Sequence, residues 1–278
     1  MQQIILTIIF FLLLTVIIGF AQWKFEKHFR DDVKAILATN ATYDILAEQD
    51  IQDLPEPVKK YIRYTGHLGK NKTRTYKAEF KGEIRSSVKS PWMKFKANQY
   101  SDAADPTRLF FIKASMKGIP VAGYHRFKNG KASMDIRALS LFKVQYAAGR
   151  EMDIAETVTH FNDMCLLAPG SLIDPRIIWR ELNEKEVEAS FSNKGISIHA
   201  TLQFSEKGEL VNFISDDRYF NASSKQQQKI RWMTPISAYK EMNGIRSPSY
   251  GEAVWVMPDG NFTYARMSID RIVINPDK

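Results

Sequence analysis

The stretch GREMDIAETVTHFNDMCLLAP, residues 149–169, decides the fold predicted for this chain. Its large apolar residues recur at intervals of four, three and four, which places them on one face of an α-helix. These residues are Ile154, Val158, Phe161 and Cys165. Acidic residues stand in the first turn, where the helix dipole favours negative charge, and a Pro-Gly pair ends the helix. One helix face is therefore expected to pack against an apolar surface.

Alternating apolar and polar residues flank this helix on both sides and supply that surface. In residues 76–84, Tyr, Ala, Phe, Gly and Ile alternate with Lys and Glu, as in an antiparallel strand with one buried face. Residues 109–112 are continuously apolar, which predicts a strand buried on both faces. Asn129-Gly130 predicts a tight hairpin turn.

These patterns predict a mainly β (α+β) fold. About ten to twelve strands form one large curved antiparallel sheet or half-barrel, with the helix at 150–168 inserted into it or lying across its mouth. We divide the chain into a transmembrane anchor at 1–22, a helical neck with a second helix at 23–69, and a β-rich domain at 70–278.

The anchor is predicted from an apolar run. Residues 4–20 would span roughly 26 Å as a helix, close to the thickness of a hydrocarbon core, and Trp23 suits the membrane interface. A signal peptide cut after Ala21 is the alternative. We favour an uncleaved single-pass anchor in the cell membrane, because the run is longer than a usual signal core and no Lys or Arg precedes it.

The basic residues after the anchor and the predicted fold favour opposite sides of the membrane for the body of the protein. Lys24, Lys27, Arg30 and Lys34 all follow the apolar run, and the positive-inside rule would place the body of the protein in the cytoplasm. The predicted fold favours the extracytoplasmic side. We prefer that side, and the conflict stays open at the level of sequence.

The neck is predicted to be an amphipathic helix over residues 23–38. Its apolar side is made by Phe25, Phe29, Val33 and Ile36. Such a helix either lies on the membrane or links the anchor to the domain.

Charge and cysteine content exclude several classes of protein. The net charge is +8, but the Lys and Arg residues are spread along the strands without a dense run. No RNA-recognition motif or zinc-finger spacing is present, so no nucleic-acid partner is predicted. Cys165 is the only cysteine, so no intrachain disulfide forms, and its place on the apolar helix face predicts a small core residue.

The polar face of the central helix is the first candidate for chemistry. Glu156 and His160 lie four residues apart, with Asp163 beside them. This spacing could hold a metal or pair a base with an orienting carboxylate, but the second His of a zincin motif is missing. We interpret the face as solvated, and predict no catalytic residue, metal or cofactor. An enzyme of the hydrolase type that uses Glu156, His160 and Glu252 is kept as an alternative.

Aromatic residues are the second signal, with 17 Phe, 11 Tyr and 5 Trp. In a half-barrel the inward positions either fill the interior or leave an apolar cavity. Three tryptophans of the second half are interleaved with arginines, as in core packing with cation–π contacts or at the rim of a lipid pocket. The candidate ligand-binding residues are Trp179, Arg231, Trp232, Arg246, Glu252, Trp255, Glu156 and His160.

Four groups of residues stand out as motifs. They are Leu54-Pro55-Glu56-Pro57-Val58 with Tyr61, Tyr64 and Gly66; Gly149-Arg150-Glu151-Met152 with Glu156; Trp232 with Thr234-Pro235; and Gly244-Ile245-Arg246 with Gly251, Ala253 and Trp255. Over residues 50 to about 275 the chain resembles a bacterial family of membrane-anchored proteins of unknown function. The resemblance brings no activity, substrate or catalytic residue. Members look similar in outline to the lipoprotein-carrier fold, a curved antiparallel sheet around helices with an apolar cavity.

Together these observations favour a membrane-tethered binding protein that performs no chemistry. Its expected partners are the membrane and a lipid, an acyl chain or a similar apolar ligand held in a β-lined cavity. The hydrolase-type enzyme is one alternative. A protein-interaction scaffold without a cavity is the other.

Overall fold

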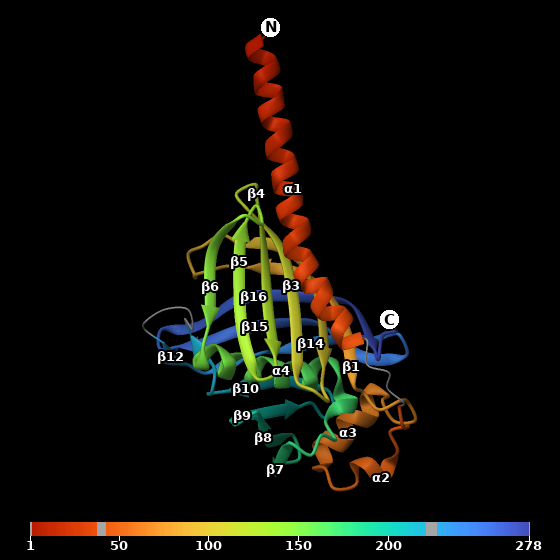
Figure 1. Cartoon of the computed structure of the whole chain (residues 1–278). Coiled ribbons are helices and arrows are strands. Elements are labelled where there is room, and N and C mark those ends of the chain that lie inside the picture. The colour runs from red at the N-terminus through yellow and green to blue at the C-terminus, as the bar shows by residue number, and fades with distance from the viewer. Residues whose placement is uncertain (1, 38–42, 221–226, 278) are drawn as a thin grey trace.

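The computed structural model describes residues 2–37, 43–220 and 227–277. A long N-terminal helix stands against the outside of a strongly curved sheet, and the sheet curls around a second long helix (Figure 1). The helices are α1 (Gln2–Leu37), α2 (Glu48–Ile51), α3 (Glu56–Thr65) and α4 (Arg150–Leu167), followed by the short 3-10 helix η1 (Pro169–Ser171).

Strands make up most of the rest of the chain. Before α4 they are β1 (Thr75–Ile84), β2 (Met93–Asp102), β3 (Thr107–Met116), β4 (Ile119–Lys128), β5 (Lys131–Ala138) and β6 (Phe142–Ala148). After it they are β7 (Ile177–Asn183), β8 (Glu186–Asn193), β9 (Ile196–Phe204), β10 (Leu210–Ser215), β11 (Tyr219–Phe220), β12 (Gln228–Lys229), β13 (Trp232–Met233), β14 (Ile236–Met242), β15 (Ile245–Met257) and β16 (Gly260–Ile274).

Fourteen of these strands form one antiparallel sheet. Its order is β6-β5-β4-β3-β2-β1-β16-β15-β13-β10-β9-β8-β7, with β14 paired to β15. The first strand therefore pairs with the last, which joins the two halves of the chain, and β6 and β7 are left as edges. The predicted α+β half-barrel is confirmed. The expected number of ten to twelve strands was too low, in part because residues 229–239, which the sequence predicts to form one strand, are divided among β12, β13 and β14. Pro235 lies at one of these breaks and cannot donate to a sheet.

The hairpin turn predicted at Asn129-Gly130 joins β4 to β5 in register. Both residues have positive φ angles, 55° and 72°. This conformation suits Asn followed by Gly and matches the twist of the strands that it connects.

Helix α4 is enclosed on every side. The apolar face predicted from its spacing is confirmed, since Val158, Phe161 and Cys165 are fully buried. The opposite face was expected to be solvated, and this was wrong: Glu156, with 1% of its surface exposed, and His160, with 0%, are equally buried. Fifteen of the 18 residues of α4 are buried, because the sheet curls far enough to cover the polar face as well.

Strand β3 separates two apolar clusters. Phe110 belongs to the main core inside the half-barrel. Leu109 and Phe111 point outward and belong to a second cluster on the convex face of the sheet. The prediction that this run is buried on both faces is therefore confirmed.

Helix α1 supplies the other side of that second cluster. Its buried residues are Phe25, Phe29, Val33 and Ile36, the four predicted for the neck. Asp32 Oδ2 also accepts hydrogen bonds from Tyr124 Oη and Arg126 Nε, both at 2.8 Å. Anchor and neck, predicted as separate segments, form one continuous helix that is docked on β3 and β4.

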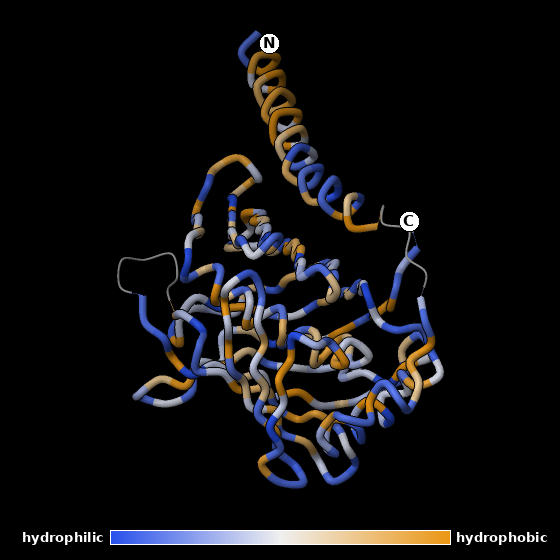
Figure 2. The backbone as a smooth tube through the Cα atoms, turned by 60° about the horizontal axis from the view of Figure 1, so that its bottom comes forward, coloured by the Kyte–Doolittle hydropathy of each residue, from blue (hydrophilic) through white to orange (hydrophobic). Residues whose placement is uncertain are grey.

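The N-terminal part of α1 projects beyond the sheet as an apolar rod (Figure 2). Among the described residues, α1 is the one helix that is long and apolar enough to cross a membrane. Within α1, the stretch of 18 residues that is apolar enough to cross a membrane contains no buried residue. These features are compatible with a single-pass anchor.

Candidate ligand-binding site

A cavity of about 250 Å³ lies between α4 and the concave face of the sheet. Most of its lining is apolar and comes from strands of both halves of the chain and from the end of α4. Representative side chains are Phe80, Phe95, Phe110, Ile112, Leu166 and Ile269. A cavity with an apolar wall and a few converging polar groups is the usual form of a small-molecule site.

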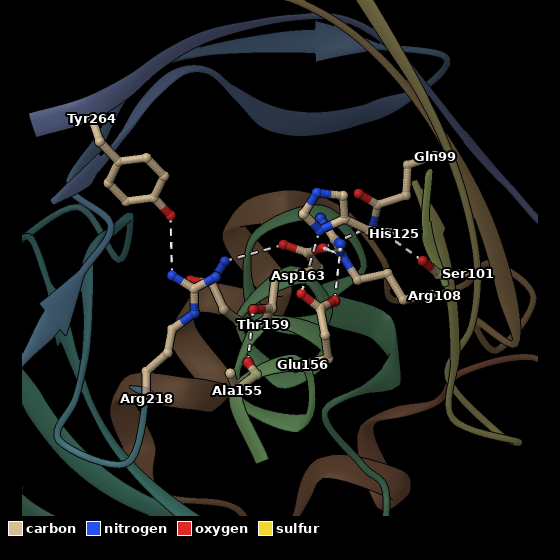
Figure 3. Close-up of polar contacts among 11 residues, drawn as sticks. Gln99, Ser101, Arg108, His125, Ala155, Glu156, Thr159, Asp163, Arg218 and Tyr264 are labelled. Atoms are coloured by element: carbon tan, nitrogen blue, oxygen red, sulfur yellow. Dashed lines mark hydrogen bonds and ion pairs between the residues drawn. The ribbon is translucent and has the colours of Figure 1, made fainter. Parts of the chain in front are cut away.

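The polar groups begin on α4, where two buried carboxylates share one arginine (Figure 3). Arg108 Nε on β3 donates to Asp163 Oδ2 at 2.6 Å, and its Nη1 lies 3.2 Å from Glu156 Oε2. Gln99 Nε2 on β2 donates a further hydrogen bond to Asp163 at 2.8 Å. The helix spacing of seven residues places both carboxylates toward β3, so a single inward-pointing arginine reaches both.

Electrostatics keep Glu156 ionised despite its burial. Burial alone would raise the pKa of Glu156, but the guanidinium of Arg108, the ring of His125 and the more distant guanidinium of Arg218 lower it to about 2. His125 Nδ1 lies 3.7 Å from Glu156 Oε1. Burial would lower the pKa of Arg108, yet the two carboxylates raise it above its ordinary value. Glu156, Asp163 and Arg108 therefore form a fixed, charged base to the cavity.

Arg218 points into the cavity from the opposite side. Its Nη1 donates to Tyr264 Oη at 3.1 Å, and its guanidinium lies 4.4 Å from the ring centre of Trp232 and 5.1 Å from that of Trp255. Its Nε is buried without a hydrogen-bond partner among the described residues. Of the charged side chains that line the cavity, Arg218 is the one for which the described part of the chain offers no ion pair.

Glu252 on β15 is a further lining carboxylate, and it is already engaged. It accepts hydrogen bonds from Tyr250 Oη at 2.7 Å and Thr263 Oγ1 at 3.2 Å. Arg266 Nε lies 3.6 Å away. Its charge is therefore balanced at the rim, away from the base formed on α4.

The structure brings some of the candidate residues together. Glu156, Trp232 and Glu252 line the cavity. Trp255 contacts Arg218 from behind and does not line it. His160 lies in the core between Phe127 and Phe191, with ring centres 5.8 and 6.1 Å away.

The other three candidates lie elsewhere. Trp179 packs near Phe161, with ring centres 6.4 Å apart. Arg231 is exposed and forms an ion pair with Asp216 at 2.8 Å. Arg246 is exposed and lies over the ring of Tyr64 on α3.

Sequence reasoning missed Arg108 and Arg218. Arg108 did carry a signal, because it has the same strand parity as Phe110 and therefore points into the half-barrel. A charged residue at such a position must meet a buried partner. The position of Arg218 gave no such signal in the sequence, since it follows two aspartates just outside a regular strand.

Metal ligation finds no support in the described part of the chain. Within residues 2–37, 43–220 and 227–277, no three His, Cys, Asp or Glu side chains are placed to hold a metal ion.

Sequence comparison connects the chain to one family. The family described as a family of unknown function (DUF6544) matches residues 44–267. None of the curated proteins matches the chain in sequence.

Solved structures of similar outline have little sequence in common with the chain. A putative outer membrane lipoprotein-sorting protein domain from Vibrio parahaemolyticus has 6% identity and a TM-score of 0.42, over 72% of this chain and 85% of that one. A LolA superfamily protein from Nitrosomonas europaea has 7% identity and a TM-score of 0.45, over 83% and 94%. A DUF1329 family protein from Desulfovibrio piger has 10% identity and a TM-score of 0.40, over 83% and 94%. At these values the comparison assigns no ligand or activity.

Proposed function

We propose that this chain, which belongs to the DUF6544 family of proteins of unknown function, is a membrane-tethered binding protein that holds the apolar chain of an amphiphile inside its half-barrel. The observation that carries this proposal is the cavity of about 250 Å³ with its largely apolar wall. An acyl chain that enters it leaves water, and each buried methylene contributes about 0.8 kcal/mol.

The polar side of the cavity indicates what the head of the ligand carries. Glu156 and Asp163 are already paired with Arg108, whereas Arg218 has its Nε unpartnered and forms no ion pair among the described residues. A guanidinium held between aromatic rings suits acceptor oxygens, such as those of a carboxylate. The ligand class proposed is therefore an acyl chain with an oxygen-bearing, anionic head.

The proposed location is the cell membrane, with the half-barrel on the extracytoplasmic side. The long apolar helix α1 supports the tether. Protease added to spheroplasts, from which any outer envelope has been removed, is expected to degrade the half-barrel. Its protection until the cells are lysed would place it in the cytoplasm, as the basic residues after the anchor suggest.

Native mass spectrometry of the full chain in detergent tests the binding function. The probes are dodecanoic acid and dodecylamine, which have the same chain and opposite head charge. The acid is expected to bind at one per protein and in preference to the amine. Equal binding of the two, or preference for the amine, would remove the anionic head from the proposal.

One matched pair of variants and one single variant locate the site. Ala114→Phe fills the cavity and is expected to abolish binding, whereas Ser115→Phe places the same ring on the other face of β3 and should leave binding intact. Arg218→Met is expected to remove the preference for the acid without removing binding of the chain. Unchanged binding by the Ala114→Phe protein would show that the cavity is not the site.

The hydrolase-type alternative gains no support from the arrangement of its residues. Glu156 and Glu252 line the cavity, but His160 is buried in the core away from it. The cavity also speaks against the other alternative, a protein-interaction scaffold without a cavity.

A further inference from the structure

Two neighbouring turns of the half-barrel carry exposed apolar side chains. We call residues 116–119 and 139–144 the hairpin tips; they are the β3–β4 and β5–β6 turns with adjoining residues of the strands. Ile119 is 46% exposed and Phe142 66%, and the other large exposed apolar side chains there are Met116, Leu141 and Val144. The two turns are adjacent, because Leu139 N–H donates to the Pro120 carbonyl at 2.8 Å.

The docking of α1 fixes the height of these tips. Phe111 on β3 meets Phe25 and Phe29 of α1, with ring centres 5.5 and 5.3 Å apart. From Phe111, β3 rises for five more residues to Met116, which is roughly 16 Å at 3.3 Å per residue. Toward the N-terminus of α1, the distance from Phe29 back to Phe20 is roughly 14 Å at 1.5 Å per residue.

The strand and the helix run upward side by side from that contact (Figure 1). Asp32 pairs with Arg126, which lies opposite Leu109 of β3. Glu26, toward the N-terminus of α1, pairs with Lys113, four residues further along β3, so the two contacts fix the common direction. The hairpin tips therefore reach the level of Phe20, where the apolar part of α1 ends and the membrane interface would lie.

The composition of the tips suits that level. They combine apolar side chains with Lys117 and Lys143 and contain no Asp or Glu. Apolar residues flanked by lysines favour the headgroup region of a bilayer that contains anionic lipid. The composition of the hairpin tips and their level along α1 therefore both favour the interface of a lipid bilayer as their partner.

We propose that the hairpin tips rest in the interface of the bilayer that α1 spans, as a second membrane contact of the half-barrel. The contact rests on the proposed anchor and not on the proposed ligand. Ala114 and Val121 face each other across β3 and β4 and line the cavity, two residues below the turn. The wall of the cavity then begins roughly 7 Å below the bilayer surface.

Fluorescence quenching on the full chain tests this contact. The protein is placed in nanodiscs of phosphatidylcholine and phosphatidylglycerol that contain a spin-labelled lipid as the quencher. A bimane label is attached to Phe142→Cys, to Leu12→Cys within the apolar part of α1, or to Ile178→Cys. Ile178 is the matched control, because it is 70% exposed but lies on edge strand β7. The native Cys165 is fully buried and remains unlabelled.

Quenching is expected at positions 12 and 142 and not at 178. In the Lys117→Glu/Lys143→Glu protein, quenching at 142 is expected to be largely lost while quenching at 12 persists. Quenching at 12 with none at 142 would overturn the proposal and leave a protein partner as the occupant of the tips. No quenching at 12 would overturn the anchor, and the second contact with it.

Discussion

Glu156 is a buried carboxylate whose charge is balanced by Arg108, 3.2 Å away. Replacing it by Gln removes one of the two partners of a buried guanidinium. We expect Glu156→Gln to lower the free energy of unfolding at pH 7 by about 3–5 kcal/mol, as for other broken buried pairs. Urea unfolding of the full chain in detergent measures this.

The exposed pair Arg180–Glu188 provides the control for that prediction. Glu188→Gln is expected to change the free energy of unfolding by less than about 1 kcal/mol. Equal effects of the two variants would show that the buried pair contributes no more than a surface pair.

The same carboxylate also sets a pH dependence. Its pKa falls from an ordinary 4.5 to about 2 in the folded protein. Its contribution is therefore complete above pH 4.5 and is lost as the pH falls toward 2. The difference in stability between the wild type and Glu156→Gln is expected to shrink over that range, and a constant difference would contradict the assignment.

Two buried histidines make the stability of the fold depend on pH in a range above that of Glu156. Burial lowers the pKa of His160 from 6.5 to about 3, and burial with the charge of Lys70 lowers that of His67 to about 4. Below pH 6.5 the unfolded chain binds protons that the folded chain does not. Stability is thus expected to fall from pH 6.5 to pH 4, by up to about 1.4 kcal/mol per pH unit for each histidine.

The double variant His67→Leu/His160→Leu tests this acid sensitivity. Unfolding at several pH values between 7 and 5 should show a smaller slope than in the wild type. An identical slope would mean that these two rings are not the source.

Single residues show where prediction from sequence fails. The strand parity of Arg108 could have placed it inside the half-barrel. His160 was predicted to lie on a solvated face, because its spacing from Glu156 suits one, and this was wrong. The curl of the sheet buries it, and no local pattern encodes that curl.

The contact between α1 and the sheet belongs to the scale of elements. Phe29 is buried against Phe111 and Tyr124 in a cluster separate from the main core. Phe29→Ala is therefore expected to loosen α1, at a cost of about 3–5 kcal/mol, without unfolding the half-barrel. Spin labels at Lys34 and Lys131 should report a narrow distance distribution in the wild type and a broad one in the variant.

Phe20→Ala is the matched control, because Phe20 lies on the same helix but is exposed. It should leave the distribution narrow. A narrow distribution in the Phe29→Ala protein would show that the remaining contacts, among them the ion pair of Asp32 with Arg126, hold the helix without Phe29.

Elements with a strong local signal were predictable, and those interrupted by tertiary pairing were not. Helix α4 and the hairpin at Asn129-Gly130 follow from spacing and turn chemistry. The stretch at 229–239 reads as one strand, yet it divides at Pro235. On one side of this break β13 pairs with both β10 and β15, whereas on the other side β14 pairs with β15 alone.

At the scale of the whole molecule, removal of α1 uncovers the second apolar cluster, on the convex face of the sheet. A protein that begins at residue 44 exposes Phe111 and Tyr124 on the convex face, and such a patch favours association. We expect this truncated protein to self-associate, and Phe111→Ser in the same protein to restore a monomer. Sedimentation velocity distinguishes the two, and a monomeric parent would contradict the role of the patch.

The overall class of the fold was predictable because alternation marks the buried face of each strand. Closure was not, since β1 pairs with β16 across about two hundred residues of sequence. That pairing places Arg108 and Arg218 on opposite sides of one cavity, so the site could be recognised only in three dimensions.

The uninterrupted helix α1 also limits how such a protein could work. If α1 spans the membrane as proposed, no flexible segment separates the span from the half-barrel, and the proposed ligand could not be carried across an aqueous gap as by a freely diffusing carrier. The half-barrel would stay at a fixed height and move only in the plane of the membrane. Any donor and acceptor of the ligand would then have to meet it at the same surface by lateral diffusion.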